Sequence, residues 1–262
     1  LDGKTYDMYH KNLFHTKLIN MDIVSPEPYR VNEYFNQKCS IAQAFDILIN
    51  KQGVRDLPKP TLVLSKEELL YARKAIDEIK EKTKKEKVVI VQPFGRAIKQ
   101  IDNSFVDQSN RSIEFHNLKN IIRKLMKKDF AVVLMSEFGI DFKDEGFPDE
   151  VALPEKVTLR QWAGIIKYAD VFLGCDSVGQ HLAYAVGTPA NVVLGATYPE
   201  NTSYPNVENF NIIDLGQMTR EYDPIRISFD ERISRKHETI MSMTPDIEDY
   251  VVSAVNGDPI EE

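Results

Sequence analysis

The sequence has few cysteines, lacks a long apolar run and carries no excess of positive charge. Cys39 and Cys175 are the only cysteines in 262 residues. Their wide spacing forms no metal-type pair and favours a reducing compartment, although a single disulfide stays open. No apolar run approaches the roughly 18 residues that a membrane-spanning helix needs. A net charge of −7 argues against a nucleic acid or a membrane surface held by bulk electrostatics.

Short motifs of several common enzyme classes are also missing from the sequence. It contains no G-x-S-x-G, H-E-x-x-H, Walker loop or G-x-G-x-x-G. His10 and His15 have no cysteine or acid cluster at metal spacing beside them, so we expect no metal site. Hydrolase and metalloenzyme functions therefore have little support. The chain begins at Leu1 without an initiator methionine or a signal-like segment, as expected of a fragment or a trimmed product.

From Val88 onward, short β-branched runs alternate with helical patterns, which is typical of a parallel sheet covered by helices. The runs are continuously apolar, as strands buried on both faces should be. We expect strands at Val88–Gln92, Ala131–Met135, Val171–Gly174, Asn191–Gly195 and Asn211–Leu215. The predicted fold class is therefore α/β, with a Rossmann-like parallel sheet and helices on both faces.

Helices are predicted from capping signals and from apolar residues that recur at helical spacing. The first 85 residues show no complete βαβ series. One expected helix opens at the capping box Ser65–Glu68 and runs through Ile79, and a second has an apolar face from Ile113 to Leu125. A third opens at the capping box Thr158–Gln161, and a fourth runs from Ser177 through Ala185 and ends near Gly187. A fifth begins at Thr244-Pro245.

Residues 174–190, GCDSVGQHLAYAVGTPA, place four notable side chains where a strand becomes a helix. These residues are Asp176, Ser177, Gly179 and His181. A helix that starts at the carboxyl end of a parallel strand presents unpaired N–H groups and a positive dipole end to an anion. The structural alternative is that Asp176 or Ser177 is only the N-cap, Gly179 a packing residue and His181 a satisfied polar side chain. The stretch alone leaves both interpretations open.

Loops after the other strands carry polar groups to the same edge of the predicted sheet. The loop Gln92–Lys99 contains a glycine and two cations, which suits phosphate, with Lys99 as the candidate contact. Glu137 follows the second strand and would accept hydrogen bonds from ribose hydroxyls. The segment Ala196–Pro205, which contains Thr197, is a lid or a connector. Taken alone, the loop Gln92–Lys99 is explained equally well as an exposed basic loop, and Glu137 is explained better as an exposed loop acid. Together, however, the loops predict a site for a phosphorylated ligand.

Residues 159–205 resemble the carboxyl-terminal half of glycosyltransferase family 9, the ADP-heptose:lipopolysaccharide heptosyltransferases. That family has D-[ST]-G-x-x-H-x-A-x-x-x-x-x-P followed by an apolar strand that ends in G-x-T-x-P. The matching positions are Asp176, Ser177, His181, Ala183, Pro189, Gly195, Thr197 and Pro199. The sequence departs from the pattern at Val178, where the family has glycine, and has Gly179 one position later.

The resemblance implies a GT-B fold, in which two Rossmann-like domains enclose the active site and the second domain holds the nucleotide sugar. We expect residues 1–85 to be a remnant of an amino-terminal domain plus a linker helix. Residues 86–243 would form the donor-binding domain, and residues 244–262 a terminal helix and tail. The donor-binding residues that the resemblance implies are Lys99, Glu137, Asp176, Ser177, Gly179, His181 and Thr197.

The implied activity is transfer of a sugar from a nucleotide-diphosphate donor, ADP-linked in the family, to a hydroxyl of a glycan or lipid-linked acceptor. Transfer would invert the sugar and need no metal or cofactor, with a general base outside this half. We expect a cytoplasmic protein, peripheral to the inner membrane face, that takes part in lipopolysaccharide biosynthesis. The alternative is a non-catalytic GT-B-like module kept for protein–protein assembly. A weaker alternative, a nucleotide-sugar epimerase or another GT-B-like enzyme, needs acid and base residues that we cannot assign.

Overall fold

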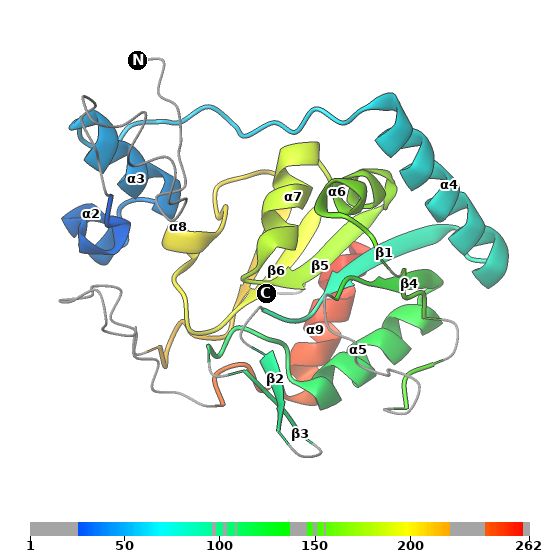
Figure 1. The fold of residues 1–262 in the computed structure, drawn as a ribbon. Helices are drawn as coiled ribbons and strands as arrows, with labels where there is room; N and C mark the ends of the chain where they lie inside the picture. Colours follow the sequence, from blue (N-terminus) through cyan, green and yellow to red (C-terminus); the bar gives the residue numbers. More distant parts are fainter. Residues whose placement is uncertain are drawn as a thin grey trace.

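The computed structural model describes residues 26–95, 98–101, 104–107, 109–136, 146–148, 151–154, 156–220 and 239–258. In this part of the chain, the central element is a five-stranded sheet in which every pairing is parallel (Figure 1). The strand order is β4-β1-β5-β6-β7. The strands are β1 (Lys87–Gln92), β4 (Phe130–Leu134), β5 (Val171–Cys175), β6 (Ala190–Leu194) and β7 (Phe210–Asp214). The predicted strands are thus confirmed, with each end displaced by one residue at most.

Two layers of helices cover the two faces of this sheet. Successive side chains of a strand point to opposite faces, so Val89 and Val91 join one buried cluster while Val88 and Ile90 join another. The first cluster includes α5 (Phe115–Lys127) and α9 (Pro245–Asn256). The second includes α4 (Lys66–Thr83), α6 (Leu159–Tyr168) and α7 (Val178–Val186). The predicted Rossmann-like α/β fold is therefore confirmed.

The helix ends follow the capping signals in the sequence. The hydroxyl of Ser65 accepts a hydrogen bond from the N–H of Glu68 at 3.2 Å, and the Glu68 carboxylate accepts one from the N–H of Ser65 at 2.6 Å. Thr158 and Gln161 form the same reciprocal pair at the start of α6. Gly187, with a φ of 84°, ends α7 in the left-handed conformation that glycine adopts readily. Helix α4 continues beyond the predicted Ile79 to Thr83.

The amino-terminal residues form a small helical module that the sequence did not predict. It consists of the 3-10 helix η1 (Pro28–Arg30), α2 (Asn32–Phe35) and α3 (Ile41–Asn50), packed around the buried Tyr34. The module contacts α8 (Pro199–Thr202), where the amide of Asn201 donates to the carbonyls of Tyr34 at 3.0 Å and Cys39 at 2.9 Å. A segment without regular structure then leads from α3 to α4 (Figure 1).

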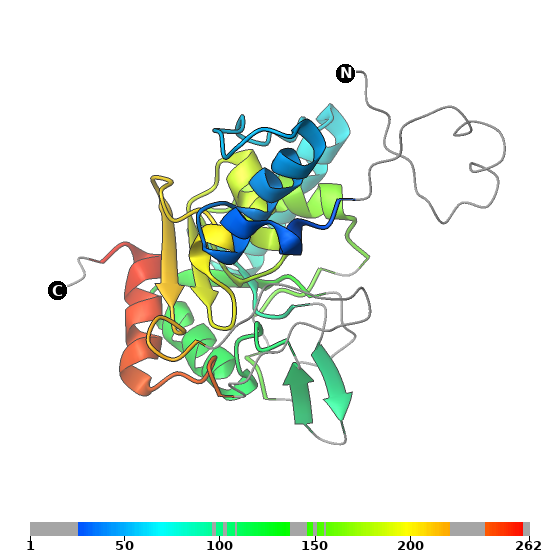
Figure 2. The ribbon, with the colours of Figure 1, turned by 90° about the vertical axis from the view of Figure 1, so that its left-hand side faces the viewer.

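A β-hairpin interrupts the connection between β1 and α5. Its strands β2 (Ile98–Ile101) and β3 (Ser104–Asp107) are antiparallel and form a sheet of their own. The hairpin projects from the side of the molecule below the central sheet (Figure 2). The sequence predicted a loop from Gln92 to Lys99, and this prediction is wrong at its end because Lys99 belongs to β2. After the hairpin, the chain returns at residues 109–113 to the end of the sheet where β1 finishes.

Candidate functional site

A cleft lies outside the carboxyl ends of β1, β4 and β5. The strand order reverses at β1, since β4 lies on one side of it and β5 on the other. Helices α5 and α6, which connect these strands, cover opposite faces of the sheet, and such a switch point opens a crevice for ligands. The cleft has a volume of about 740 Å³, a size that suits a small-molecule ligand. The described residues that line it are Gln92, Phe94, Gly95, Arg111, Met135, Ser136, Leu159, Asp176, Ser177, Val178 and His181.

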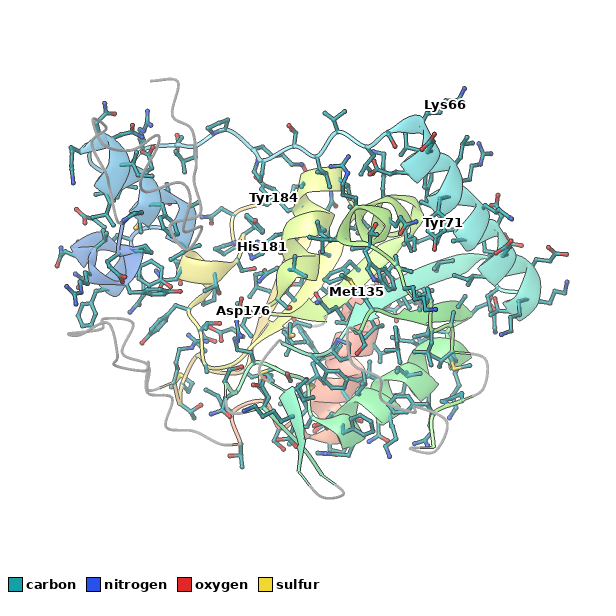
Figure 3. All side chains as sticks on the ribbon, in the orientation of Figure 1. Lys66, Tyr71, Met135, Asp176, His181 and Tyr184 are labelled. Atoms are coloured by element: carbon teal, nitrogen blue, oxygen red, sulfur yellow. The ribbon has the colours of Figure 1, made fainter. Side chains whose placement is uncertain are left out.

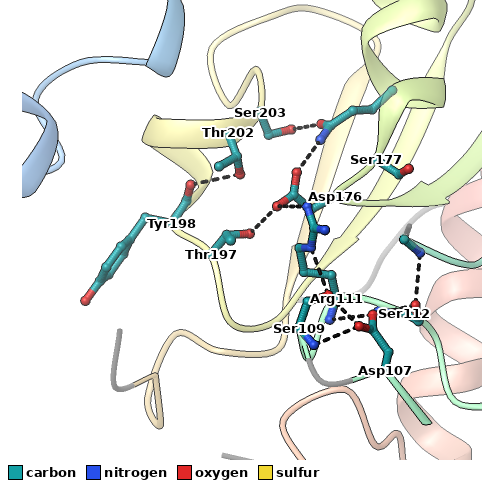
Figure 4. Close-up of polar contacts among 12 residues, drawn as sticks. Asp107, Ser109, Arg111, Ser112, Asp176, Ser177, Thr197, Tyr198, Thr202 and Ser203 are labelled. Atoms are coloured by element: carbon teal, nitrogen blue, oxygen red, sulfur yellow. Dashed lines mark hydrogen bonds and ion pairs between the residues drawn. The ribbon is translucent and has the colours of Figure 1, made fainter. Parts of the chain in front are cut away.

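Asp176 follows β5 and anchors a buried hydrogen-bond network at the floor of this cleft (Figures 3 and 4). Its Oδ2 accepts from the hydroxyl of Thr197 at 3.0 Å, and its Oδ1 accepts from the amide of Gln180 at 3.3 Å. The amide oxygen of Gln180 accepts in turn from Ser203 at 2.7 Å. Only 7% of Asp176 is exposed. The carboxylate therefore orders the loop after β6 and the first turn of α7.

Arg111 supplies a cation to the cleft, next to Asp176 (Figure 4). Its Nη1 lies 3.8 Å from Oδ2 of Asp176, and its Nε donates to the hydroxyl of Ser109 at 3.0 Å. The Arg111 side chain is 27% exposed, so the ion pair is partly screened by solvent and holds Arg111 only weakly. A ligand anion can therefore compete with Asp176 for this cation.

Asp107, at the end of β3, organises the segment that carries Arg111. Its carboxylate accepts from the N–H and hydroxyl of Ser109, at 2.8 and 2.5 Å, and from those of Ser112, at 2.9 and 2.6 Å. Burial alone would raise the pKa of Asp107, but these hydrogen bonds outweigh it and keep the pKa below its usual value. Ser112 also accepts from the N–H of Gly95 at 2.9 Å. The hairpin and the loop after β1 are thus fastened together beside the cleft.

The start of α7 is capped by Gln92 from β1 rather than by its own N-cap side chain. The Gln92 amide oxygen accepts from the N–H of Gly179 at 2.6 Å, and its amide nitrogen donates to the hydroxyl of Ser177 at 3.1 Å. Because Ser177 accepts this bond, its own hydroxyl proton is available to a ligand. A Cβ on Gly179 would lie 2.5 Å from the ring of Phe172 and would clash with the Gln92 amide. The glycine at this position is therefore explained by the path of Gln92.

Val178 occupies the position where the family pattern has glycine. It is the first residue of α7, has helical backbone and is half-buried against the cluster that covers this face of the sheet. A side chain causes no backbone strain in this conformation. Val178 also lines the cleft, so its methyl groups form part of the wall.

His181 lies one turn into α7 and lines the cleft (Figure 3). Its Nδ1 lies 2.8 Å from the hydroxyl of Tyr204. His181 is partly accessible to solvent. Protein atoms nevertheless surround much of the ring, and this desolvation lowers the pKa of His181 below its usual value, while the Asp176 carboxylate acts in the opposite direction. The imidazole is therefore neutral at neutral pH and offers one donor and one acceptor nitrogen.

The structure brings Asp176, Ser177 and His181 together at one edge, as the sequence predicted. Thr197 is buried behind Asp176, as described above. Lys99 is exposed on β2 and is not among the described residues that line the cleft. Glu137 lies outside the described residues. The roles of all these residues in donor binding stay predictions.

Two residues of the cleft were missed from the sequence. Arg111 follows the unpredicted hairpin, so its approach to β5 had no local signal. Gln92 was recognised as the end of a strand and the start of the loop Gln92–Lys99, but its side-chain contacts with Ser177 and Gly179 were not predicted.

Two expectations concern what the chain lacks. Across the described ranges, no group of three or more His, Cys, Asp or Glu side chains is placed to hold a metal ion. Metal-independent transfer stays a prediction. None of the helices described has the length and apolar character needed to cross a membrane.

Residues 118–222 match the family model for glycosyltransferase family 9 (heptosyltransferase). Lipopolysaccharide heptosyltransferase 3 of Escherichia coli is 32% identical over 120 residues, which cover 42% of this chain and 31% of that protein.

Two solved structures share the fold. The glycosyl transferase family 9 protein of Veillonella parvula matches with a TM-score of 0.52 and 12% identity, over 69% of this chain and 51% of that one. The E. coli ADP-heptose lps heptosyltransferase II matches with a TM-score of 0.52 and 15% identity, over 83% of this chain and 62% of that one. The chain thus spans about a third of its curated relative and between half and two thirds of these structures. The fold of the described residues is therefore that of the matching parts of these two structures, and the family model and the E. coli relative confirm that this chain resembles glycosyltransferase family 9.

Proposed function

We propose that the cleft binds the nucleotide-diphosphate sugar donor of a heptosyltransferase-like glycosyltransferase. The observation that carries this proposal is the set of anion-binding groups at the switch point: the Arg111 guanidinium, the Ser177 hydroxyl and the His181 imidazole all line one cleft at the amino-terminal end of α7. Each offers a hydrogen bond to a diphosphate, and the helix dipole adds positive potential. The resemblance to family 9 supports ADP as the nucleotide.

The two ends of the donor would meet different walls. The diphosphate would lie against Ser177, His181 and Arg111, where the charge that develops on the leaving group is stabilised by preorganised donors. The nucleoside would lie against the apolar lining, formed by Phe94, Met135 and Leu159. Asp176 would stay out of contact with phosphate because like charges repel, and would act by ordering Thr197 and Gln180.

Transfer itself would follow the inverting, metal-independent course that the resemblance implies. The acceptor hydroxyl would lose its proton to a general base, which we expect in the part of the relatives that this chain does not span. The acceptor would be a glycan or lipid-linked hydroxyl in lipopolysaccharide biosynthesis, at the cytoplasmic face of the inner membrane. The departure from the family pattern at Val178 would favour the alternative of a non-catalytic module, but the helical backbone at Val178 weakens that argument.

Calorimetry with ADP and UDP on the chain tests this proposal. We expect binding of ADP and a loss of roughly ten- to a hundredfold in affinity for Arg111→Met, because a charge-assisted hydrogen bond is removed. His181→Ala should weaken binding by about tenfold. Lys167→Met is the matched control, since it removes an exposed cation of α6 that is not among the described residues lining the cleft and should change affinity little. If the intact chain binds neither nucleotide, the donor-site assignment fails and the assembly module becomes the better account.

A further inference from the structure

One side chain outside the cleft holds the imidazole of His181. The Tyr204 hydroxyl lies 2.8 Å from Nδ1, and the two rings are nearly perpendicular, at 85°, with their centroids 5.6 Å apart. Tyr204 is not among the described residues that line the cleft, whereas His181 is. With Nδ1 engaged by the tyrosine, Nε2 is the ring nitrogen left for a ligand.

Several elements fix the position of the Tyr204 ring. It stacks on Tyr184 of α7 with centroids 3.9 Å apart and meets the edge of Phe210 of β7 at 5.1 Å. The preceding residue, Ser203, donates to Gln180 at 2.7 Å. Asn201, in the short helix α8 just before Ser203, is hydrogen-bonded to the amino-terminal module. The hydroxyl therefore has little freedom to move away from His181.

The hydrogen bond between Tyr204 and His181 has two possible directions, and the one in which the phenol donates pairs the better donor with the better acceptor. Desolvation lowers the pKa of His181, and burial raises the pKa of Tyr204 to about 12. Both side chains are thus neutral near neutral pH, and the phenol keeps its proton. If the phenol donates to Nδ1, the imidazole proton sits on Nε2 and can be donated to an oxyanion. With the opposite tautomer, Nε2 carries a lone pair, which an oxyanion would repel.

We propose that Tyr204 is a positioning residue for the donor site. Its hydroxyl donates to Nδ1 of His181 and selects the tautomer in which Nε2–H faces the cleft and binds a phosphate oxygen of the nucleotide. The identity of the ligand rests on the proposed function. The tautomer is a property of the ligand-free chain and can be measured without any nucleotide.

The test combines a nitrogen NMR spectrum with a matched pair of variants. At about pH 8, where the imidazole is neutral, the wild-type chain should show a protonated Nε2 and an unprotonated Nδ1 for His181. Tyr204→Phe removes the hydroxyl and keeps the ring, so it should give a mixture of tautomers and weaken ADP binding by roughly three- to tenfold. Tyr184→Phe removes a hydroxyl from the stacked neighbour and should change neither result.

Three outcomes are decisive. A protonated Nδ1 in the wild-type spectrum overturns the proposal, and so does a Tyr204→Phe variant with unchanged tautomer and unchanged affinity. The wild-type spectrum decides the tautomer by itself, even if the variant does not fold. Should ADP fail to bind while the spectrum is as expected, the proposed function is refuted and the selection of the tautomer by Tyr204 is supported.

Discussion

Replacing Gly179 with alanine should destabilise the chain, although the same change in an ordinary helix stabilises it. Alanine is favoured over glycine in a helix interior by about 1 kcal/mol. Here the new Cβ would lie 2.5 Å from the ring of Phe172 and would force the Gln92 amide away from the Gly179 N–H, a hydrogen bond of 2.6 Å. Overpacking costs about 1–3 kcal/mol, and loss of a helix cap about 1 kcal/mol. The expected net change is a loss of about 2 kcal/mol in the free energy of unfolding.

Urea unfolding of wild type and Gly179→Ala measures this change as a shift of the midpoint, by roughly 1 M at a typical slope. Gln92→Ala and the double variant complete a double-mutant cycle. Because Gln92→Ala has already removed the cap, adding Gly179→Ala to it should cost about 1 kcal/mol less than in wild type. A variant Gly179→Ala that is as stable as wild type, or more stable, would refute the view that Gln92 occupies the start of α7.

Three further predictions concern the carboxylates Asp176 and Asp107 beside the cleft and the contact of Asn201 with the amino-terminal module. Asp176→Ala should lower the free energy of unfolding by about 2 kcal/mol, because it leaves two buried donors unpaired. Asp176→Asn keeps an acceptor and should cost less than half as much. Equal losses of stability for the two variants in urea unfolding would contradict the network. Asp107 has a lowered pKa when folded, so its stabilisation is complete above about pH 4 and is lost as the pH falls through the folded pKa. Between about pH 5 and pH 2, stability should therefore fall less steeply for Asp107→Asn than for wild type, and parallel curves would rule this out. Asn201→Ala should release the amino-terminal module, seen as faster limited proteolysis within α2 and α3, and an unchanged cleavage rate would argue against this anchor.

The sheet and most helices could be predicted because their signals are local. A run such as Val171-Phe172-Leu173 is apolar at every position, and only a strand covered on both faces buries it all. Capping boxes such as Ser65–Glu68 mark a helix start within four residues. The amino-terminal module was missed although Ser40 and Gln43 form the same box, which is confirmed at the start of α3.

The site was predictable only in part, because its contacts are tertiary. The sequence located Asp176, Ser177 and His181 because a motif and a strand end coincide there. Gln92 reaches Ser177 across 85 positions of the chain, and no local pattern reports such a contact. Arg111 is brought to Asp176 by a hairpin that was missed although the sequence Asp102-Asn103-Ser104 favours a turn, so the cation nearest to the motif was sought at Lys99 instead.

A crystal structure of the chain with ADP tests the central claim most directly. The account predicts the diphosphate at the amino-terminal end of α7, within hydrogen-bond distance of Ser177, Nε2 of His181 and the guanidinium of Arg111. ADP bound elsewhere, for instance in the smaller pocket beside Lys59 and Tyr184, or no bound ADP at a concentration far above physiological levels, would contradict it.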